Sequence, residues 1–265
     1  MKPAATPAKK PASPPAPTSA RPSAPPSPER NGNTAATKVP PLLPTHFNAK
    51  DRSVMVLVPM GKYTVGRPPR RRKPAGEGQA QRTSLLAFYI DRTEITIEQY
   101  RLFDRRYPEQ HPPCPTCPAT GINWMQASRY CLWAGKRLPR EAEWEAAARG
   151  PGMARWPWGN DFLPEKGNTA EEGARKVLPV GSYPSGASPS GALDMAGNVW
   201  EWVRSPLGGA VKSESGERLQ VLKGGGFLSD ARAAEISFRN FAPTAMKHAA
   251  FGFRCVKPPP RAVSR

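Results

Sequence analysis

Residues 191–202 read GALDMAGNVWEW, and this stretch decides the fold of the chain. The segment before it is rich in Gly, Pro, Asn and Ser, the residues of turns and loops, and its own end overlaps a strand candidate at 199–203. Large aromatic side chains mostly fill cores, so we assign Trp200 and Trp202, together with Trp144, to the core. All seven Trp lie between positions 124 and 202, which places the densest part of the core in the second half of the chain.

Toward the N-terminus, the sequence predicts three helices. The first two have capping boxes, in which polar side chains three residues apart cap the free N–H groups at a helix start. These boxes are Thr96 with Gln99 and Asn123 with Gln126. The second helix is expected to stop at Gly135, and the third to run from Pro139 through the helix-favouring segment 141–148 to Gly150.

Short apolar runs on either side of the helices predict strands. They are 54–59, 62–65 as its hairpin partner, and 85–90 before the helices, then 199–203, 220–223, 236–239 and 251–256. Two or three helices followed by a loop-dominated half with short strands is typical of an α+β domain.

The N-terminal segment has a different composition. Residues 1–44 hold 13 of the 34 prolines and no Trp, Tyr or Phe. Such a segment buries too little apolar surface to offset its ordering entropy. We therefore predict a disordered, basic, Pro- and Ala-rich arm at 1–52, one globular domain at 53–258 and a short basic tail at 259–265.

The chain carries a formal net charge of +18, which attracts polyanions, anionic lipid or acidic proteins without choosing among them. The sharpest cluster is Arg67, Arg70, Arg71, Arg72 and Lys73. A solvated loop is the favoured interpretation because no aromatic residue there could stack on bases. The alternative is a polyanion contact made by this cluster and the basic arm. No run of about 18 apolar residues and no signal-peptide pattern occurs, so we expect no membrane span and a cytoplasmic location. We also expect the protein to be a monomer.

Several segments of the chain resemble the formylglycine-generating enzyme, or sulfatase-modifying factor, family. They are 124–150 (WMQASRYCLWAGKRLPREAEWEAAARG), 156–160 (WPWGN), 180–183 (VGSY), 191–202, 222–227 (LKGGGF) and 252–255 (GFRC). They follow the family's order across residues 54–257. The resemblance implies a loop-rich fold of the C-type-lectin-like kind, which is itself α+β.

That family oxidises a cysteine of a sulfatase peptide with O2 and Cu(I) held by two thiolates, the soft ligands that select Cu(I). The positions of the two cysteines, shortly after the triple glycine, correspond to Ser229 and Ala234 here, and residues 227–234 contain no sulfur. The loop between Tyr107 and Asn123 is also shorter than the family's, which implies the loss of part of the peptide groove. Copper binding and sulfatase activation are therefore not expected.

We accordingly predict a non-catalytic binding or accessory module with a protein or peptide partner. The alternative is an oxidase of the same family whose metal ligands have changed. A Ser229 nucleophile beside Asp230 is conceivable, but no His lies on the same segment to act as its base, so a turn is favoured. The three histidines are far apart in the sequence, at His46, His111 and His248.

The resemblance also implies bound Ca2+, a hard cation that takes several oxygen ligands. Carried over by position, the ligands are the Asp194 and Glu201 side chains with the Gly197 and Val199 carbonyls at a first site, and Asn168 with the Thr169 carbonyl at a second. The alternative at the first site is that the two acidic residues cap turns and pair with Arg or Lys. The second site is the less supported one, because its acidic ligand cannot be placed within 171–176.

The four cysteines form two sets. The resemblance implies that Cys131 and Cys255 join the second helix to the last strand in a disulfide, or remain buried thiols in a reducing compartment. Without a visible signal peptide, thiols are favoured. Cys114 and Cys117 follow His111 with C-x-x-C spacing, which is weak evidence for zinc or redox chemistry, since no second cysteine pair exists and the neighbouring prolines indicate a rigid turn.

Overall fold

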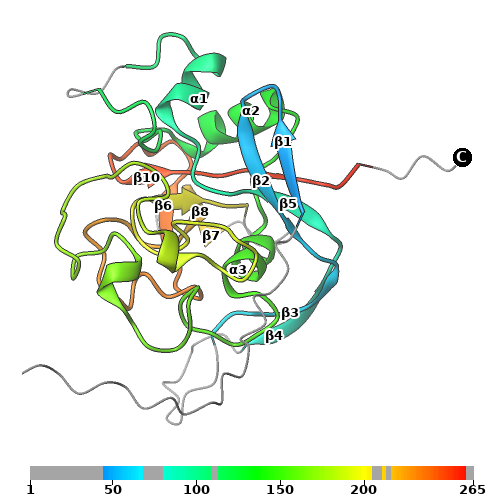
Figure 1. Ribbon diagram of the computed structural model, residues 1–265. Helices are drawn as coiled ribbons and strands as arrows, with labels where there is room; N and C mark the ends of the chain where they lie inside the picture. Colours follow the sequence, from blue (N-terminus) through cyan, green and yellow to red (C-terminus); the bar gives the residue numbers. More distant parts are fainter. Residues whose placement is uncertain (1–43, 68–79, 109–112, 205–210, 213–215, 261–265) are drawn as a thin grey trace, which may run out of the picture. The chain divides into compact units, whose positions relative to one another are not determined.

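A computed structural model describes residues 44–67, 80–108, 113–204, 211–212 and 216–260. Strands precede and follow a block of three helices, and long loops connect the elements of the second half (Figure 1). The mixture of few helices and several short sheets is the α+β architecture that the sequence predicts. The arm up to residue 43, the basic cluster beyond Arg67 and His111 lie outside the described residues.

The first sheet has the strand order β1-β2-β5-β11. Its strands are β1 (Thr45–Asn48), β2 (Ser53–Val58), β5 (Phe88–Asp91) and β11 (Val256–Lys257), and every neighbouring pair is antiparallel. The last strand of the chain therefore closes the sheet that the first strand opens. Because β1 pairs with β2, the globular fold begins before residue 53, inside the segment assigned to the arm.

A sharp bend separates this sheet from a two-stranded ribbon of β3 (Gly61–Val65) and β4 (Gln81–Leu85). The run expected as one strand at 85–90 is broken by the bend, where Leu86 points outward and is 79% exposed. The sequence also predicted β3 as the hairpin partner of β2. Instead β3 pairs with β4, since the chain turns away from β2 at the bend.

The second sheet has the order β10-β6-β8-β7, with β9 on the other edge of β8. Its strands are β6 (Trp200–Trp202), β7 (Val211–Lys212), β8 (Arg218–Lys223), β9 (Asn240–Pro243) and β10 (Phe251–Gly252). The strand expected at 236–239 lies four residues further along, as β9. The run 251–256 is split between the two sheets, because the chain crosses from β10 to β11 through Phe253 and Cys255, which are fully buried.

The helices are α1 (Ile97–Phe103), α2 (Trp124–Trp133) and α3 (Glu141–Arg149), and the 3-10 turns are Pro164–Lys166 and Pro184–Gly186. Both predicted capping boxes are present. Helix α3 begins two residues later than expected, at Glu141 instead of Pro139. The rings of Tyr100 on α1 and Tyr130 on α2 stack 5.4 Å apart, which fixes the two helices side by side.

The acidic side chains of α3 are buried and paired with cations from other elements. Glu141 accepts from Arg239, Glu143 from Arg137, and Glu145 from Lys223. Burying a charge costs several kcal/mol unless a partner compensates it. Ion pairs thus connect helix α3 to the chain before it, to the end of β8 and to the residue that precedes β9.

Charge is distributed unevenly between inside and outside. Nine carboxylate side chains are buried in the described part of the chain, against four cationic ones. The fold therefore hides more negative than positive charge, and its surface is more basic than the composition alone indicates.

Two disulfides use all four cysteines: Cys131 with Cys255, and Cys114 with Cys117. The first joins α2 to the strand that closes the first sheet. Cys131 and Cys255 form the disulfide that the resemblance implies, in place of the buried thiols that were favoured, and the disulfide between Cys114 and Cys117 leaves no free thiolate for the weakly supported zinc site.

Candidate functional site

The turn after β8 holds Ser229 and Ala234, the residues that the resemblance assigns to the positions of the family's two copper-binding cysteines. Ser229 lies in a closed loop, where its hydroxyl accepts a hydrogen bond from the backbone N–H of Gly226 at 2.9 Å and its N–H donates to the Gly226 carbonyl at 2.8 Å. Asp230 accepts from the backbone N–H of Ala233 at 2.7 Å. Ser229 and Asp230 therefore stabilise a turn, and neither is arranged as a nucleophile with a base.

Ala234 fills the second position and is fully buried, packed with Trp156 and Ala196. A Cβ atom added to Gly225 would lie 3.1 Å from the Ala234 Cα atom, so the middle glycine of the triplet allows the two segments to touch. Soft sulfur ligands are absent from both positions, and the packing leaves no unpaired polar group at either.

The stretch 194–201 is a tight turn that brings the backbone against residue 168. Gly197 has φ +93°, and an added Cβ would lie 2.3 Å from the carbonyl oxygen of Asn168. Asp194 and Asn198 also adopt positive φ, an unusual conformation that Asp and Asn tolerate better than most residues. The residue types of the 194–201 stretch are thus required by its positive φ angles and by the close backbone contact with Asn168, as well as by the chemistry of their side chains.

Although burial alone would lower the pKa of the Arg254 guanidinium, three buried carboxyl groups, from Glu94, Asp194 and Glu201, lie close enough to raise it. Arg254 donates to both oxygens of Glu201 at 2.7 Å, and Trp144 donates to Glu201 Oε2 at 2.8 Å. Asp194 Oδ2 accepts from the backbone N–H of Gly181 at 2.6 Å. The pairing of Glu201 with an arginine is the alternative that the sequence left open for this residue.

Glu94 is the third carboxyl of the cluster, and sequence reasoning did not identify it. Its Oε1 accepts from Asn198 at 3.0 Å, whereas its Oε2 is buried without a hydrogen-bond partner. Burial, followed by the charge of Asp194, holds the pKa of the Glu94 carboxyl well above its ordinary value of 4.5. Burial also raises the pKa of Asp194. The cluster thus contains three carboxyl groups and one guanidinium, and the raised pKa values of Glu94 and Asp194 reflect the cost of ionising both carboxyls beside Glu201.

Asn168 and Thr169 supply further oxygens without partners. The Asn168 amide donates to the Lys176 carbonyl and to Asn198 Oδ1, while Asn168 Oδ1 and Thr169 Oγ1 are buried and unpaired. Asn198 therefore links this pair to Glu94, since its own amide donates to that carboxyl. The acidic residues nearest in sequence, Glu171 and Glu172, are exposed and do not join the cluster.

These residues fit a hard cation in chemistry and charge. The donor set consists of carboxylate, amide and hydroxyl oxygens, which suit Ca2+, and two of the buried side-chain acceptors, Glu94 Oε2 and Asn168 Oδ1, have no protein donor. A cation at Glu201 would share that carboxylate with Arg254. Within the described ranges, no three His, Cys, Asp or Glu side chains are arranged as a metal centre, so backbone and amide oxygens would have to complete the ligand set.

The remaining candidate residues are dispersed. The ring of His46 lies against Tyr89, and His248 lies against Phe251, on different sheets. Trp144 and Trp202 are fully buried and Trp200 is partly buried, in agreement with their assignment to the core.

A model of the sulfatase-modifying factor enzyme 1-like domain matches residues 43–259. The chain belongs to this family. The inactive C-alpha-formylglycine-generating enzyme 2 of Bos taurus is 38% identical over 125 residues, which cover 43% of this chain and 40% of that protein. The formylglycine-generating enzyme of the same organism is 29% identical over 214 residues, 56% of each chain.

Among solved structures, PvdO from Pseudomonas aeruginosa superimposes with a TM-score of 0.67 and 25% identity, over 80% of this chain and 97% of that one. The chain spans only about half the length of the two bovine relatives. It covers 56% of the formylglycine-generating enzyme and 40% of the inactive enzyme 2. None of the helices in the described part is both long and apolar enough to cross a membrane.

Proposed function

We propose that this family domain acts as a non-catalytic binding or accessory module for a protein or peptide partner. The observation that supports the proposal is the closed turn at 227–234, in which the Ser229 hydroxyl is bound by the backbone and Ala234 is buried. The resemblance assigns these two residues to the positions of the family's copper-binding cysteines. A hydroxyl engaged by the backbone and a buried methyl group offer Cu(I) no soft ligand. The similarity to an enzyme named as inactive supports the same proposal.

The test compares the wild type with the double variant Ser229→Cys/Ala234→Cys. Each protein is titrated with Cu(I) in the presence of a competing chelator, and oxygen consumption is then followed with a cysteine-containing peptide. We expect no stoichiometric copper binding by the wild type. The double variant should gain Cu(I) affinity, because it restores two thiolates to the turn.

Copper binding with turnover by the wild type would instead support the alternative, a formylglycine-generating-type oxidase with altered ligands. Binding by neither protein would show that the turn at 227–234 does not bring the two positions together, and the non-catalytic proposal would stand.

We further propose that the domain binds Ca2+ through oxygens of the loops 168–169 and 194–201. The unpaired acceptors of Glu94 and Asn168 and the surplus of buried carboxylates support this proposal. When bound, the ion would stabilise the loops that meet at Gly197 and would take no part in a reaction. Occupancy by Ca2+ would also remove the need to protonate Glu94.

The cytoplasmic location stays a prediction. Disulfides persist mainly in oxidising compartments, so the thiol content of the protein in its native cells is the measurement that decides it.

A further inference from the structure

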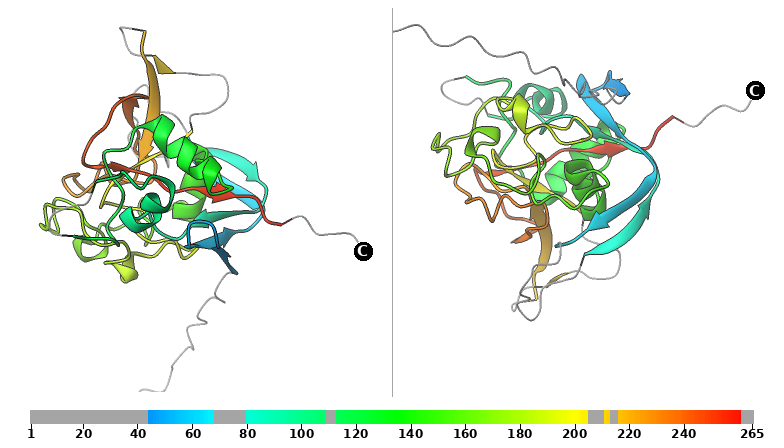
Figure 2. Two further views of the ribbon diagram at one scale, coloured as in Figure 1. Left: turned by 90° about the horizontal axis from the view of Figure 1, so that it is seen from above. Right: turned by 60° about the horizontal axis from the view of Figure 1, so that its bottom comes forward.

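The C-terminal ends of α1 and α2 lie beside the turn between β1 and β2, on the same side of the domain (Figure 1 and Figure 2). The rings of Phe103 and Trp133, the last residues of the two helices, lie 5.5 Å apart. The β1–β2 turn is fixed beside them, because the Asn48 side-chain amide donates to the Ala134 carbonyl at 3.0 Å. Three segments separated in sequence are therefore held together by buried contacts.

Exposed apolar and cationic side chains belong to these three segments. We define the helix-end surface by Lys50, Leu102, Arg105, Arg129, Leu132 and Trp133. Leu132 is 67% exposed, Leu102 is also exposed, and Arg105, Arg129 and Lys50 are exposed beside them.

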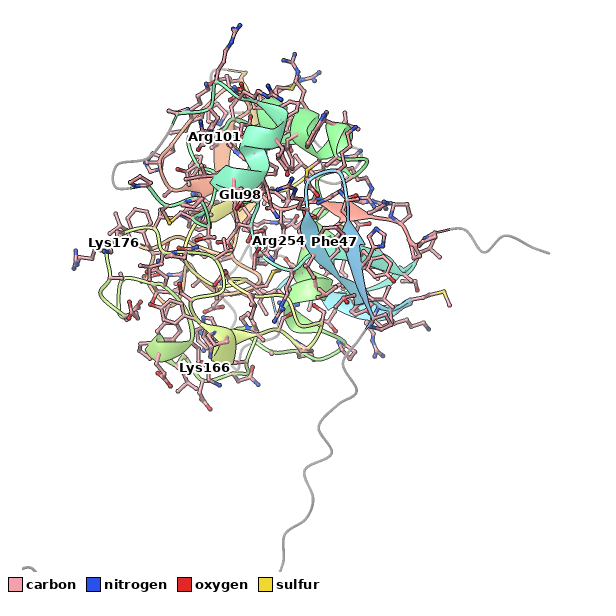
Figure 3. All side chains as sticks on the ribbon, turned by 45° about the horizontal axis from the view of Figure 1, so that its top comes forward. Phe47, Glu98, Arg101, Lys166, Lys176 and Arg254 are labelled. Carbon is pink, nitrogen blue, oxygen red and sulfur yellow. A yellow bond between two sulfur atoms is a disulfide. The ribbon has the colours of Figure 1, made fainter. Side chains whose placement is uncertain are left out.

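The surface has a positive balance even when its acidic neighbours are counted. Arg101 and Glu98 lie on α1 (Figure 3), and Asp104 ends that helix, where its carboxylate accepts from the backbone N–H of Arg106 at 3.0 Å. These segments thus carry two acidic residues, Glu98 and Asp104, against the three cations of the helix-end surface and Arg106. The burial of nine carboxylates in the interior leaves no further acidic residue of the helices to offset them.

We propose that the helix-end surface docks on an anionic lipid bilayer. Leucines that reach the interface and cations that remain at the headgroups are the two components of interfacial binding. The full net charge of +18 and the surplus of exposed cations attract such a surface. This peripheral docking requires no membrane-spanning helix.

The geometry favours a bilayer over a nucleic acid. Stacking on bases needs a free aromatic face, and the Trp133 ring is covered by the Lys50 ammonium group at 5.2 Å from its centroid. Aliphatic groups such as Leu102 and Leu132 gain little from a phosphate backbone, whereas they gain free energy when a bilayer interface removes them from water.

Two matched variants of the full chain test the proposal. Leu132→Asp/Arg129→Glu changes the helix-end surface, while Leu86→Asp/Arg82→Glu makes the same replacements at exposed residues of β4 and the bend after it. Both keep the basic arm and change the net charge equally. Binding is measured by co-sedimentation with vesicles of phosphatidylcholine, alone or mixed with phosphatidylglycerol.

We expect the wild type to bind the mixed vesicles, and the helix-end variant to bind them about tenfold more weakly. The control variant should bind within about twofold of the wild type. Equal losses in both variants would overturn the proposal, because general charge attraction by the arm and surface would then explain binding. So would unchanged binding by the helix-end variant.

Single-stranded DNA of mixed sequence is titrated with the same proteins. Loss of DNA binding by the helix-end variant with vesicle binding intact would also overturn the proposal, in favour of a nucleic-acid surface. If the double variant unfolds, Leu132→Ser replaces it, since a side chain that is 67% exposed contributes little to the core, and the same outcomes apply.

Discussion

Arg254 and Glu201 form a bidentate ion pair in the interior, with both nitrogen–oxygen distances at 2.7 Å and both side chains almost completely buried. Arg254 also donates to the carbonyl oxygens of Asp91, Arg92 and Leu193. A single guanidinium therefore links the second sheet, the end of the first sheet and the turn-rich motif.

Removing this guanidinium should be severely destabilising. Arg254→Met leaves Glu201, Asp194 and Glu94 in the interior without their cation, and we expect a loss of about 3–5 kcal/mol in unfolding free energy. Arg239→Met is the matched control, because its guanidinium also pairs with a buried glutamate but is half-exposed; a loss of about 1 kcal/mol is expected there. Urea unfolding gives both values, and equal losses would contradict the role assigned to Arg254.

The contact of Gly197 with Asn168 predicts a position-specific effect of alanine. Gly197→Ala should prevent folding or cost several kcal/mol, since its Cβ would overlap the Asn168 carbonyl oxygen. Gly173 has nearly the same φ, at +92° against +93°, but no atom lies within 4 Å of its added Cβ. Gly173→Ala should therefore cost only the strain of positive φ, about 1–2 kcal/mol. Thermal unfolding of the two variants separates close contact from strain, and similar stabilities would refute the close approach.

Millimolar Ca2+ should raise the unfolding temperature of the wild type. The expected stabilisation is about 2.7 kcal/mol when the ion is at a hundred times its dissociation constant. Asp194→Ala and Asn168→Ala should each reduce or abolish the shift in unfolding temperature, and the sizes of the two losses identify which loop provides the ligands. The control Asp161→Ala replaces an exposed acid and should keep the full shift. No shift in the wild type would count against the calcium proposal.

The acidic face of α3 predicts sensitivity to low pH. Burial alone would raise the pKa of Glu141 and Glu143, but hydrogen bonds from Arg239 and Arg137 lower both pKa values below the ordinary 4.5. Groups with depressed pKa contribute stability that is present above their unfolded-state pKa and lost as the pH falls through the folded one.

The unfolding free energy should consequently decrease as the pH falls below about 4.5. Glu143→Gln should lower stability at neutral pH and flatten this decrease. The exposed Glu165→Gln should follow the wild-type pH profile. Parallel curves for all three proteins in chemical denaturation would show that the α3 pairs do not cause the acid sensitivity.

The two disulfides should differ in their contribution to stability. Cys131 and Cys255 are 124 residues apart, whereas Cys114 and Cys117 are three apart. In the chain-entropy model, replacing Cys131 and Cys255 with Ala removes the disulfide that closes the long loop and lowers the unfolding free energy by about 5 kcal/mol. Replacing Cys114 and Cys117 with Ala removes the disulfide of the short loop and lowers it by about 2 kcal/mol. Unfolding of each double alanine variant tests the order, and a larger loss for the short loop would contradict it.

The sequence predicted correctly those features that depend only on residues close together in the chain. The capping pairs Thr96 with Gln99 and Asn123 with Gln126 formed as predicted, because a helix cap is satisfied within four residues of the chain. Family membership could likewise be predicted from the ordered motifs, since each motif preserves a turn or a core contact of the fold.

Pairing between distant segments could not be predicted in this way. The partner of β3, the bend at Leu86 and the early start of the sheet at β1 depend on which strands meet in three dimensions. Glu94 shows the same limit for the candidate site, because nothing near it in the sequence signals a buried carboxyl, and it joins Asp194 only through the fold.

The sequence by itself determined the family, the three helices and the absence of sulfur at positions 229 and 234, all of which are properties of residues read in order. Only the tertiary structure decided where the charge is placed, with nine carboxylates inside and most cations outside, and which oxygens lack partners. The physical reason is that burial and electrostatic compensation depend on the full set of neighbours in space, and those neighbours come from segments far apart in the sequence, 163 residues in the case of the Arg254 contact with Asp91.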